Sequence, residues 1–440
     1  MKKVLILGAG LVARPLVRYL LDQPDLEVEV ASRTVSKAEK LIETHPRGKA
    51  KELNLKNEEG LKEEVSGADL VISMVPYSFH PKVAEFCIAH KKQMVTTSYV
   101  SEAMKKFDGE ARKAGIIILN ELGLDPGIDH MEAMRVINEI HDKGGELLSF
   151  ISFCGGLPAP EAKTNPFGYK FSWSPMGVLL AGKNSAQYLK DGKEVFIPSE
   201  ILFDNYSLVP IEGLGVFEGY PNRNSLPYID LYGIQETKTM LRGTLRNIGW
   251  CETIKKMVEL GILDQEEKDW TGLTYADFLR KLIGNQAKKD LKKALCEYLK
   301  IDPGLAIVRR LEWLGLLSAE PLPVQKGSAL DIVAARMIEK LAYAEGERDM
   351  IILQHEFIAS YPKGRKEKII STLIDFGIPD GDSSMARTVG LPAAIGTKLI
   401  LEGKIREKGV HIPVLPDIYK PILQELRNLN IAFKEKREKL

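Results

Sequence analysis

A glycine-rich turn close to the amino terminus narrows the choice of fold more than any other stretch of the sequence. The apolar run at residues 4–7 (VLIL) is typical of a buried parallel strand, and residues 8–13 (GAGLVA) follow it directly. Glycines in such a turn let the backbone approach a pyrophosphate, and a small residue at position 13 lets the next helix pack on the strand. Residues 14–21 continue as a helix whose first N–H groups would face the phosphates. The pattern predicts a dinucleotide-binding unit; the alternative is an ordinary glycine turn between strand and helix.

The end of the second predicted strand, at residues 27–31, indicates which dinucleotide is bound. An NAD-binding chain typically carries Asp or Glu here, which accepts a hydrogen bond from the ribose 2′-OH. In this chain Ser32, Arg33 and Thr34 follow instead. A guanidinium and two hydroxyls suit a 2′-phosphate, which a carboxylate would repel. We therefore expect NADP(H) rather than NAD(H); the alternative is that Arg33 is a solvated surface residue.

Three further strands are predicted at residues 69–75, 94–97 and 116–119. The segments between them, at residues 81–90 and 101–114, carry apolar residues at helical spacing. Polar residues follow each strand, and the carboxyl ends of the strands in an open α/β sheet line one ligand crevice. The sequence therefore predicts an α/β fold, a Rossmann doubly wound parallel sheet, to about residue 130.

Beyond this point the pattern changes. Residues 146–153, 201–203 and 350–358 have strand-like alternation or apolar runs, which predicts a mixed-sheet α+β domain. Residues 249–345 contain several segments with apolar spacing near 3.6 and are predicted to form a helical insertion. The charged tail at residues 434–440 is expected to be a frayed end.

The composition excludes several classes of partner. Lys and Arg number 61 and Asp and Glu 60, a formal net charge of +1, and no basic block suggests a nucleic-acid or membrane partner. The first apolar run stops at Gly8, too short for the roughly 7–15 apolar residues of a signal peptide, and no stretch approaches the roughly 18 of a membrane span. The histidines show no metal-ligand spacing, so no metal is expected. The cysteines are widely spaced and suggest free thiols in the cytoplasm: Cys87, Cys154, Cys251 and Cys296.

Short motifs in a fixed order along nearly the whole chain point to a known family. They are residues 8–13 (GAGLVA), 32–34 (SRT), 98–99 (SY), 123–130 (GLDPGIDH), 154–158 (CGGLP), 170–175 (KFSWSP), 220–225 (YPNRNS), 243–246 (GTLR) and 388–409. In this order and spacing the chain resembles the saccharopine dehydrogenases of the NADP-dependent, L-glutamate-forming kind, the saccharopine reductase family.

The resemblance implies an oxidoreductase of lysine metabolism, which splits the secondary amine saccharopine into L-glutamate and 2-aminoadipate 6-semialdehyde or joins them in reverse. It also implies a homodimer formed through the sheet of the second domain. With the glycine turn, it gives these candidate cofactor-binding residues: Gly8, Gly10, Leu11, Val12, Ala13, Ser32, Arg33, Thr34, Val75, Pro76, Tyr77, Ser78, Leu124, Asp125, Pro126, Trp173 and Ser174. The substrate-binding candidates that it implies are Ser98, Tyr99, Asp125, Arg223, Thr244, Leu245 and Arg246.

The sequence pattern, together with the resemblance, suggests how the domains are arranged. A Rossmann domain is expected at residues 1–130 and a substrate-binding and dimerisation domain at residues 131–248 and 346–384, which carries the insertion at residues 249–345. The segment from about residue 385 to 440 is expected to pack back on the Rossmann domain.

The chemistry of saccharopine agrees with these residues. Its carboxylates need fixed cations, and arginine donates two parallel hydrogen bonds to a carboxylate. Arg223 and Arg246 are candidates; the alternative is that both are surface arginines in loops. Asp125 is suited to a substrate ammonium or to capping the next helix. Tyr99 and Asp125 are both candidates for catalytic proton transfer, whereas His130 fits a packed or hydrogen-bonded histidine better.

Two other functions are kept open. Asn224 stands where the family motif has an aspartate, which leaves room for a carboxynorspermidine-type dehydrogenase that reduces another carboxylated imine. The motifs around Arg223 and Arg246 favour saccharopine. A non-catalytic NADP-binding sensor is the second alternative, and the polar strand ends argue against it.

Overall fold

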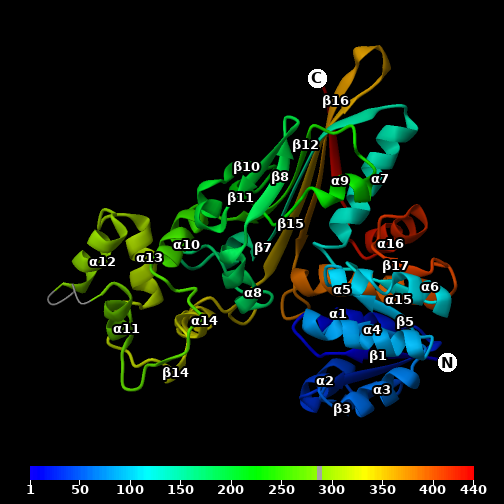
Figure 1. Cartoon of the computed structure of the whole chain (residues 1–440), viewed down its shortest axis with the longest axis horizontal. Helices are drawn as coiled ribbons and strands as arrows, with labels where there is room; N and C mark the ends of the chain where they lie inside the picture. Colours follow the sequence, from blue (N-terminus) through cyan, green and yellow to red (C-terminus); the bar gives the residue numbers. More distant parts are fainter. Residues whose placement is uncertain (285–289) are drawn as a thin grey trace. The chain divides into compact units, whose positions relative to one another are not determined.

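The structure is a computed structural model that describes residues 1–284 and 290–440 and divides into two compact units (Figure 1). Unit 1 comprises Met1–Leu147 and Ala359–Leu440, and unit 2 comprises Leu148–Ile358. The predicted three-part domain division stays a prediction, and residues 285–289 of its helical insertion lie outside the described residues.

Unit 1 is built around a parallel sheet with the strand order β3-β2-β1-β4-β5-β6-β17. The order reverses between β1 and β4, which is the switch point where doubly wound sheets bind ligands beyond their carboxyl ends. This confirms the predicted Rossmann sheet. Its strands are β1 (Lys2–Leu7), β2 (Leu26–Ser32), β3 (Gly48–Glu52), β4 (Leu70–Ser73), β5 (Gln93–Thr96), β6 (Ile117–Leu119) and β17 (Gly409–His411).

Helices cover both faces of this sheet. Leu5 and Leu7 of β1 lie in one apolar core with Val65 and Val83 of the helices on that face. The alternate side chains of β1 point to the other face, where α1 packs against α15. The helices of unit 1 are α1 (Ala13–Leu21), α2 (Val35–Ile42), α3 (Glu58–Ser66), α4 (His80–Ala89), α5 (Glu102–Lys105), α6 (Asp108–Ala114), α7 (Ile128–Asp142), α15 (Ser384–Leu401) and α16 (Pro416–Asn428).

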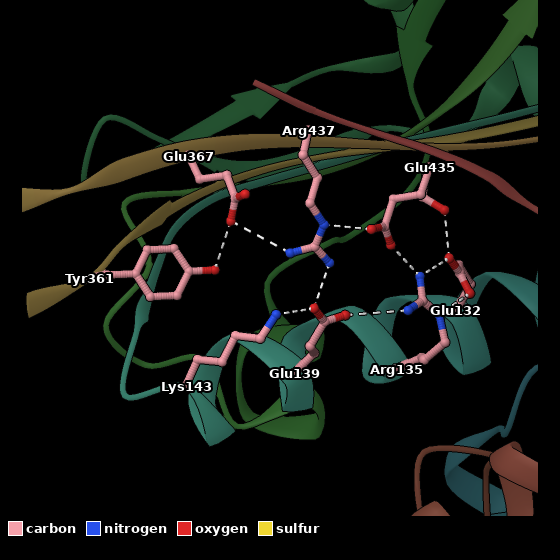
Figure 2. Close-up of polar contacts among 9 residues, drawn as sticks. Glu132, Arg135, Glu139, Lys143, Tyr361, Glu367, Glu435 and Arg437 are labelled. Atoms are coloured by element: carbon pink, nitrogen blue, oxygen red, sulfur yellow. Dashed lines mark hydrogen bonds and ion pairs between the residues drawn. The ribbon is translucent and has the colours of Figure 1, made fainter. Parts of the chain in front are cut away.

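The carboxy-terminal tail is ordered, so the prediction of a frayed end is wrong. It forms β18 (Lys434–Lys439), which pairs antiparallel with β16 (Lys366–Phe376). Figure 2 shows why so charged a strand is held: its side chains meet opposite charges on α7. Glu435 lies 2.6 Å from Arg135, and Arg437 lies 2.7 Å from Glu139. Alternation of charge across the contact replaces the apolar face that a strand ordinarily needs.

Unit 2 contains a mixed sheet, as predicted. β10 pairs antiparallel with β11 and β11 with β12, whereas β12 runs parallel to β7; β8 and β9 form a hairpin beside β12. The strands are β7 (Glu146–Pro158), β8 (Ala186–Lys190), β9 (Lys193–Ile197), β10 (Ser207–Ile211), β11 (Gly215–Pro221), β12 (Thr239–Arg246) and β15 (Asp349–Ser360).

The strand predicted at residues 201–203 is wrong. These residues lie in a 3₁₀ helix, Ser199–Asp204, that begins directly after Pro198. A three-residue apolar run is too short for periodicity to separate strand from helix, and a proline at the start of a helix costs it no hydrogen bond.

The predicted helical insertion contains α10 (Trp250–Glu259), α11 (Tyr275–Leu282), α12 (Leu291–Leu299), α13 (Ala306–Leu314) and α14 (Ala329–Lys340). Thr274 with Asp277 caps the start of α11, and Ser328 with Asp331 caps α14 in the same way. α13 packs against both α10 and α14. Unit 2 also contains two smaller helices, α8 (Pro175–Leu180) and α9 (Pro227–Tyr232), and a short pair, β13 (Lys268–Asp269) with β14 (Lys326–Gly327). Across the described ranges, no helix combines the length and apolar character needed to cross a bilayer.

Candidate functional site

The glycine turn after β1 has the geometry that the sequence predicts. Gly8 has a φ of +111°, and a Cβ there would lie 2.8 Å from the carbonyl oxygen of Met74, so only glycine fits. A Cβ on Gly10 would meet nothing within 4 Å. The turn therefore leaves open space beside Gly10, where the backbone can approach a pyrophosphate.

The first turn of α1 is suited to an anion. Its N-cap is Val12, no described side chain caps it, and its first turn carries no acidic residue. The N–H groups and the positive end of the helix dipole are thus available at the carboxyl end of β1. Leu11, 72% exposed, and Tyr77, 76% exposed, flank this point in the loops after β1 and β4. Pro76 and Ser78 beside Tyr77 are exposed, and Val75 is half-buried.

The segment after β2 carries a cation without an acidic residue beside it. Ser32 ends the strand, and its hydroxyl accepts the backbone N–H of Thr34 at 3.3 Å. Arg33 is exposed and makes no ion pair with any residue of the described ranges. Arg14, by contrast, is paired with Glu43 and Asp382. Arg33 is therefore the arginine whose charge is available to a phosphate at this edge.

Tyr99 and Asp125 are brought together although 26 residues separate them. The Tyr99 hydroxyl donates to Asp125 Oδ1 at 3.0 Å. Tyr99 follows β5, and Asp125 lies in the loop between β6 and α7, joined to Pro126 by a cis peptide bond. Both loops leave the sheet at the carboxyl ends of neighbouring strands. This places a phenol and a carboxylate, two groups able to exchange a proton, at the edge where polar side chains were predicted to converge.

A buried pair holds these two loops in place. Glu121 accepts the backbone N–H of Val100 at 2.9 Å and contacts Nε2 of His130 at 2.7 Å. His130 is completely buried, so it fits the predicted packed role rather than that of a base. The backbone of Gly127 lies so close to Gly123 that a Cβ at position 127 would be 2.0 Å from the carbonyl oxygen of Gly123. Only glycine therefore fits at this position of the loop.

Sequence reasoning missed a histidine at this edge. His80 begins α4 and lies within 2.8 Å of both Ser73, at the end of β4, and Ser98, after β5. Its spacing from the other histidines is not that of a metal site. The signal that it offered was its place, a polar residue at the start of a helix just after a strand end.

The candidates of unit 2 lie on three separate stretches: before α8, in the loop after β11 and at the end of β12. Trp173 packs on Gly177, where a Cβ would lie 2.8 Å from its ring, and Ser174 caps α8 by accepting the Gly177 N–H at 3.3 Å. Thr244, Leu245 and Arg246 end β12 and pair with β11.

Arg246 is buried, so the alternative that it is a surface arginine in a loop is wrong. Arg246 is 4% exposed. Its guanidinium lies 5.0 Å from the ring centre of Tyr169 and 5.5 Å from that of Trp250. Nη1 donates to the carbonyl oxygen of Leu245 at 2.7 Å, but the buried Nε has no hydrogen-bond partner among the described residues. The carboxylate of Glu218, opposite Arg246 on β11, accepts the N–H groups of Gly249 and Cys251. Such a buried cation is suited to a negative ligand.

Arg223 differs from Arg246 in its setting. It is exposed, in a loop after β11, with a φ of +56°. Its carbonyl oxygen accepts the N–H of Gln187 at 2.8 Å, and the next residue, Asn224, accepts the N–H of Leu226 at 3.0 Å. Asn224 therefore fixes a local turn.

The described side chains form no group of three or more His, Cys, Asp or Glu arranged to hold a metal ion. The chemistry that unit 1 can offer is dinucleotide binding beside a phenol–carboxylate pair; unit 2 offers cations for carboxylates.

Comparison with known proteins matches both parts of the chain. Residues 4–119 match the saccharopine dehydrogenase NADP-binding domain, and residues 123–431 match the saccharopine dehydrogenase C-terminal domain. Saccharopine dehydrogenase [NADP(+), L-glutamate-forming] of Saccharomyces cerevisiae is 42% identical over 99% of both chains, and that of Schizosaccharomyces pombe is 40% identical over the same shares.

Two further matches extend this. The mitochondrial alpha-aminoadipic semialdehyde synthase of Bos taurus is 40% identical over 98% of this chain, which spans 47% of that longer protein. The solved structure of apo histidine-tagged saccharopine dehydrogenase (L-Glu forming) from Saccharomyces cerevisiae aligns over 100% of both chains with a TM-score of 0.91 and 41% identity.

Proposed function

The chain belongs to the saccharopine dehydrogenase family, and we propose that it cleaves saccharopine oxidatively to L-glutamate and 2-aminoadipate 6-semialdehyde or condenses them in reverse. It is an NADP-dependent oxidoreductase of the L-glutamate-forming kind that acts on a CH–NH group in lysine metabolism. The observation that carries the site assignment is Arg246, a buried cation whose Nε lacks a partner among the described residues.

The cofactor is proposed to lie along the carboxyl ends of β1, β2 and β4. The open space at Gly10 and the uncapped start of α1 fit a pyrophosphate, and Arg33 with Ser32 and Thr34 fits a 2′-phosphate. When bound, NADP supplies the hydride acceptor, and NADPH the donor for the reverse reaction. Leu11 and Tyr77 offer exposed apolar surface to its rings. Contacts from Val75, Leu124, Trp173 and the remaining candidates are part of the same proposal.

The carboxylates of the substrate are proposed to bind Arg223 and Arg246, with Ser98, Thr244 and the Leu245 backbone as further contacts. Saccharopine presents several carboxylates to the protein, and an exposed and a buried arginine can take different ones. Arg246 gains more from the ligand, because its charge is out of water and each hydrogen bond to a buried charge is stronger there.

Proton transfer is proposed to involve Tyr99 and Asp125. The secondary amine must lose a proton before it is oxidised, and the carboxylate of Asp125 is a suitable acceptor. The Tyr99 hydroxyl, 3.0 Å from Asp125 Oδ1, orients that carboxylate and can pass the proton on.

We further propose that the protein is a cytoplasmic homodimer. All four cysteines are free and buried, as expected in a reducing compartment. Leu208, 63% exposed, and Val216, 49% exposed, share one face of the β10–β11 hairpin, which gives a second copy an apolar surface. The domain roles predicted from the sequence are kept: cofactor binding by residues 1–130 and substrate binding by the mixed-sheet part.

The test is formation of NADPH, followed by absorbance, with saccharopine and NADP⁺. We expect turnover with saccharopine and much less with carboxynorspermidine or with NAD⁺. Turnover with carboxynorspermidine alone would support the alternative dehydrogenase. Tight NADP binding without turnover of any carboxylated amine would leave the sensor and overturn the proposal.

A further inference from the structure

The buried ring of His80 joins the ends of two neighbouring strands. Its Nδ1 lies 2.8 Å from Ser73 Oγ, at the end of β4, and its Nε2 lies 2.8 Å from Ser98 Oγ, beyond β5. Nε2 also lies 3.3 Å from Thr96 Oγ1, which accepts the backbone N–H of Ser98. His80 is 2% exposed and Ser73 and Thr96 are completely buried, whereas Ser98 is half-buried. The ring thus fixes the position of the Ser98 hydroxyl.

The ring is neutral at working pH. Burial lowers the pKa of His80 to about 4, and no acidic side chain contacts the ring among the described residues. A neutral imidazole carries one N–H and one acceptor nitrogen, so its two short contacts must run in opposite senses. Either Ser98 donates to Nε2, or Nε2–H donates to Ser98.

The two arrangements give Ser98 different chemistry. If Ser98 donates to the ring, its only proton is used and it offers a ligand lone pairs alone. If Nε2–H donates to Ser98, that proton remains for a ligand. In this second arrangement the Ser73 hydroxyl donates to Nδ1. The Ser73 hydroxyl is fully buried, and the ring is its one side-chain contact among the described residues, so this arrangement gives its proton an acceptor. In both arrangements Thr96 Oγ1 makes a second, longer contact with the same nitrogen, Nε2, at 3.3 Å.

We propose that His80 is a positioning residue that, protonated on Nε2, holds Ser98 as a hydrogen-bond donor to a substrate carboxylate. Anionic oxygen only accepts hydrogen bonds, so a serine that faces it must keep its proton for it. The inference rests on the proposed function, in which Ser98 contacts saccharopine.

Paired substitutions test this in the full-length enzyme. S98A should raise the KM for saccharopine about tenfold, the effect of losing one hydrogen bond to a charged group. H80L alone should raise the KM for saccharopine nearly as much. Added to S98A, H80L should raise the KM for saccharopine no further. H80Q, whose amide N–H reaches the position of Nε2, should stay within about threefold of wild type.

The controls separate positioning from folding. H90L makes the same substitution just after α4, at the other end of that helix from His80, and should leave the KM for saccharopine unchanged. The KM for NADP should stay within about twofold in every variant. Additive effects of H80L and S98A, or parallel rises in both KM values, would overturn the inference.

The proton itself can be observed. In a ¹⁵N-labelled protein, the His80 ring, assigned by its loss in H80Q, should show the proton on Nε2. A proton on Nδ1 would overturn the inference whatever the kinetics. If the wild type does not turn over saccharopine, the proposed function fails, and this spectrum still decides how the ring is arranged.

Discussion

Replacing Arg246 with methionine should weaken substrate binding without weakening the fold. Methionine has a similar length and no charge, so it removes the buried cation and leaves most of the apolar packing. Among the described residues, the charge contacts one hydrogen-bond acceptor, at 2.7 Å, and the faces of Tyr169 and Trp250. None of these contacts supplies a negative charge to balance that of Arg246.

The stability terms nearly cancel. Cation–π contacts of a desolvated arginine contribute about 2 kcal/mol, and the hydrogen bond about 1.5–3 kcal/mol. Burial of a charge without an opposite charge costs several kcal/mol in return. The thermal midpoint of R246M, measured by circular dichroism without ligands, should therefore equal or exceed that of the wild type.

The effect on substrate is larger. Removing one partner of a buried, hydrogen-bonded charge pair costs about 2–5 kcal/mol. At about 1.4 kcal/mol for each factor of ten, the KM for saccharopine should rise at least about thirtyfold. The KM for NADP should not change.

Arg336 provides the matched control. It is equally buried, at 3% exposed, but it is paired with Glu320 at 2.8 Å and with Glu339 at 2.9 Å. R336M should lower the thermal midpoint and leave the KM for saccharopine unchanged. A KM for R246M within about threefold of wild type would refute the carboxylate role of Arg246.

Three further predictions concern other parts of the chain. R33D should reverse the preference for NADP over NAD, because a carboxylate repels the 2′-phosphate; unchanged relative affinities by fluorescence titration would contradict this. Burial opposes ionisation of Glu435, but hydrogen bonds from Arg437 and Arg135 lower the pKa of this carboxyl group in the folded protein. The ionised carboxylate therefore stabilises the fold above the pKa of the unfolded chain, and this stabilisation is lost as the pH falls through the pKa of the folded protein. R437M should therefore flatten the fall of the thermal midpoint between about pH 6 and 3, and an unchanged slope would count against the network in Figure 2. L208K combined with V216K should convert the proposed dimer to a monomer in light scattering; a dimer that persists in this variant would contradict the proposed interface.

The Rossmann sheet was predictable because its signals are local. A buried parallel strand needs an apolar run, which is visible in the sequence. The turn after β1 has no room for a side chain at position 8, so the glycine there is visible in the sequence as well. Strands β3 and β18 carry no such signal. Both are exposed edge strands, and β18 is held by charges of α7 that lie some 300 residues away in the sequence.

The candidate site was predictable where function dictates residue type at strand ends. The contact of Tyr99 with Asp125 follows from their places after β5 and β6, although their distance does not. The burial of Arg246 did not follow, because the aromatic rings around it come from residues 169 and 250. The role of His80 also depends on strand order, since only adjacent β4 and β5 bring Ser73 and Ser98 to one ring.

The measurement that tests the central claim most directly is identification of the products by mass spectrometry after incubation with saccharopine and NADP⁺. Oxidation of the C–N bond on the aminoadipate side to an imine, followed by hydrolysis of that imine by water, must yield one L-glutamate and one 2-aminoadipate 6-semialdehyde for each NADPH formed. Appearance of L-lysine and 2-oxoglutarate would mean that the other C–N bond is cleaved, and it would contradict the proposed reaction.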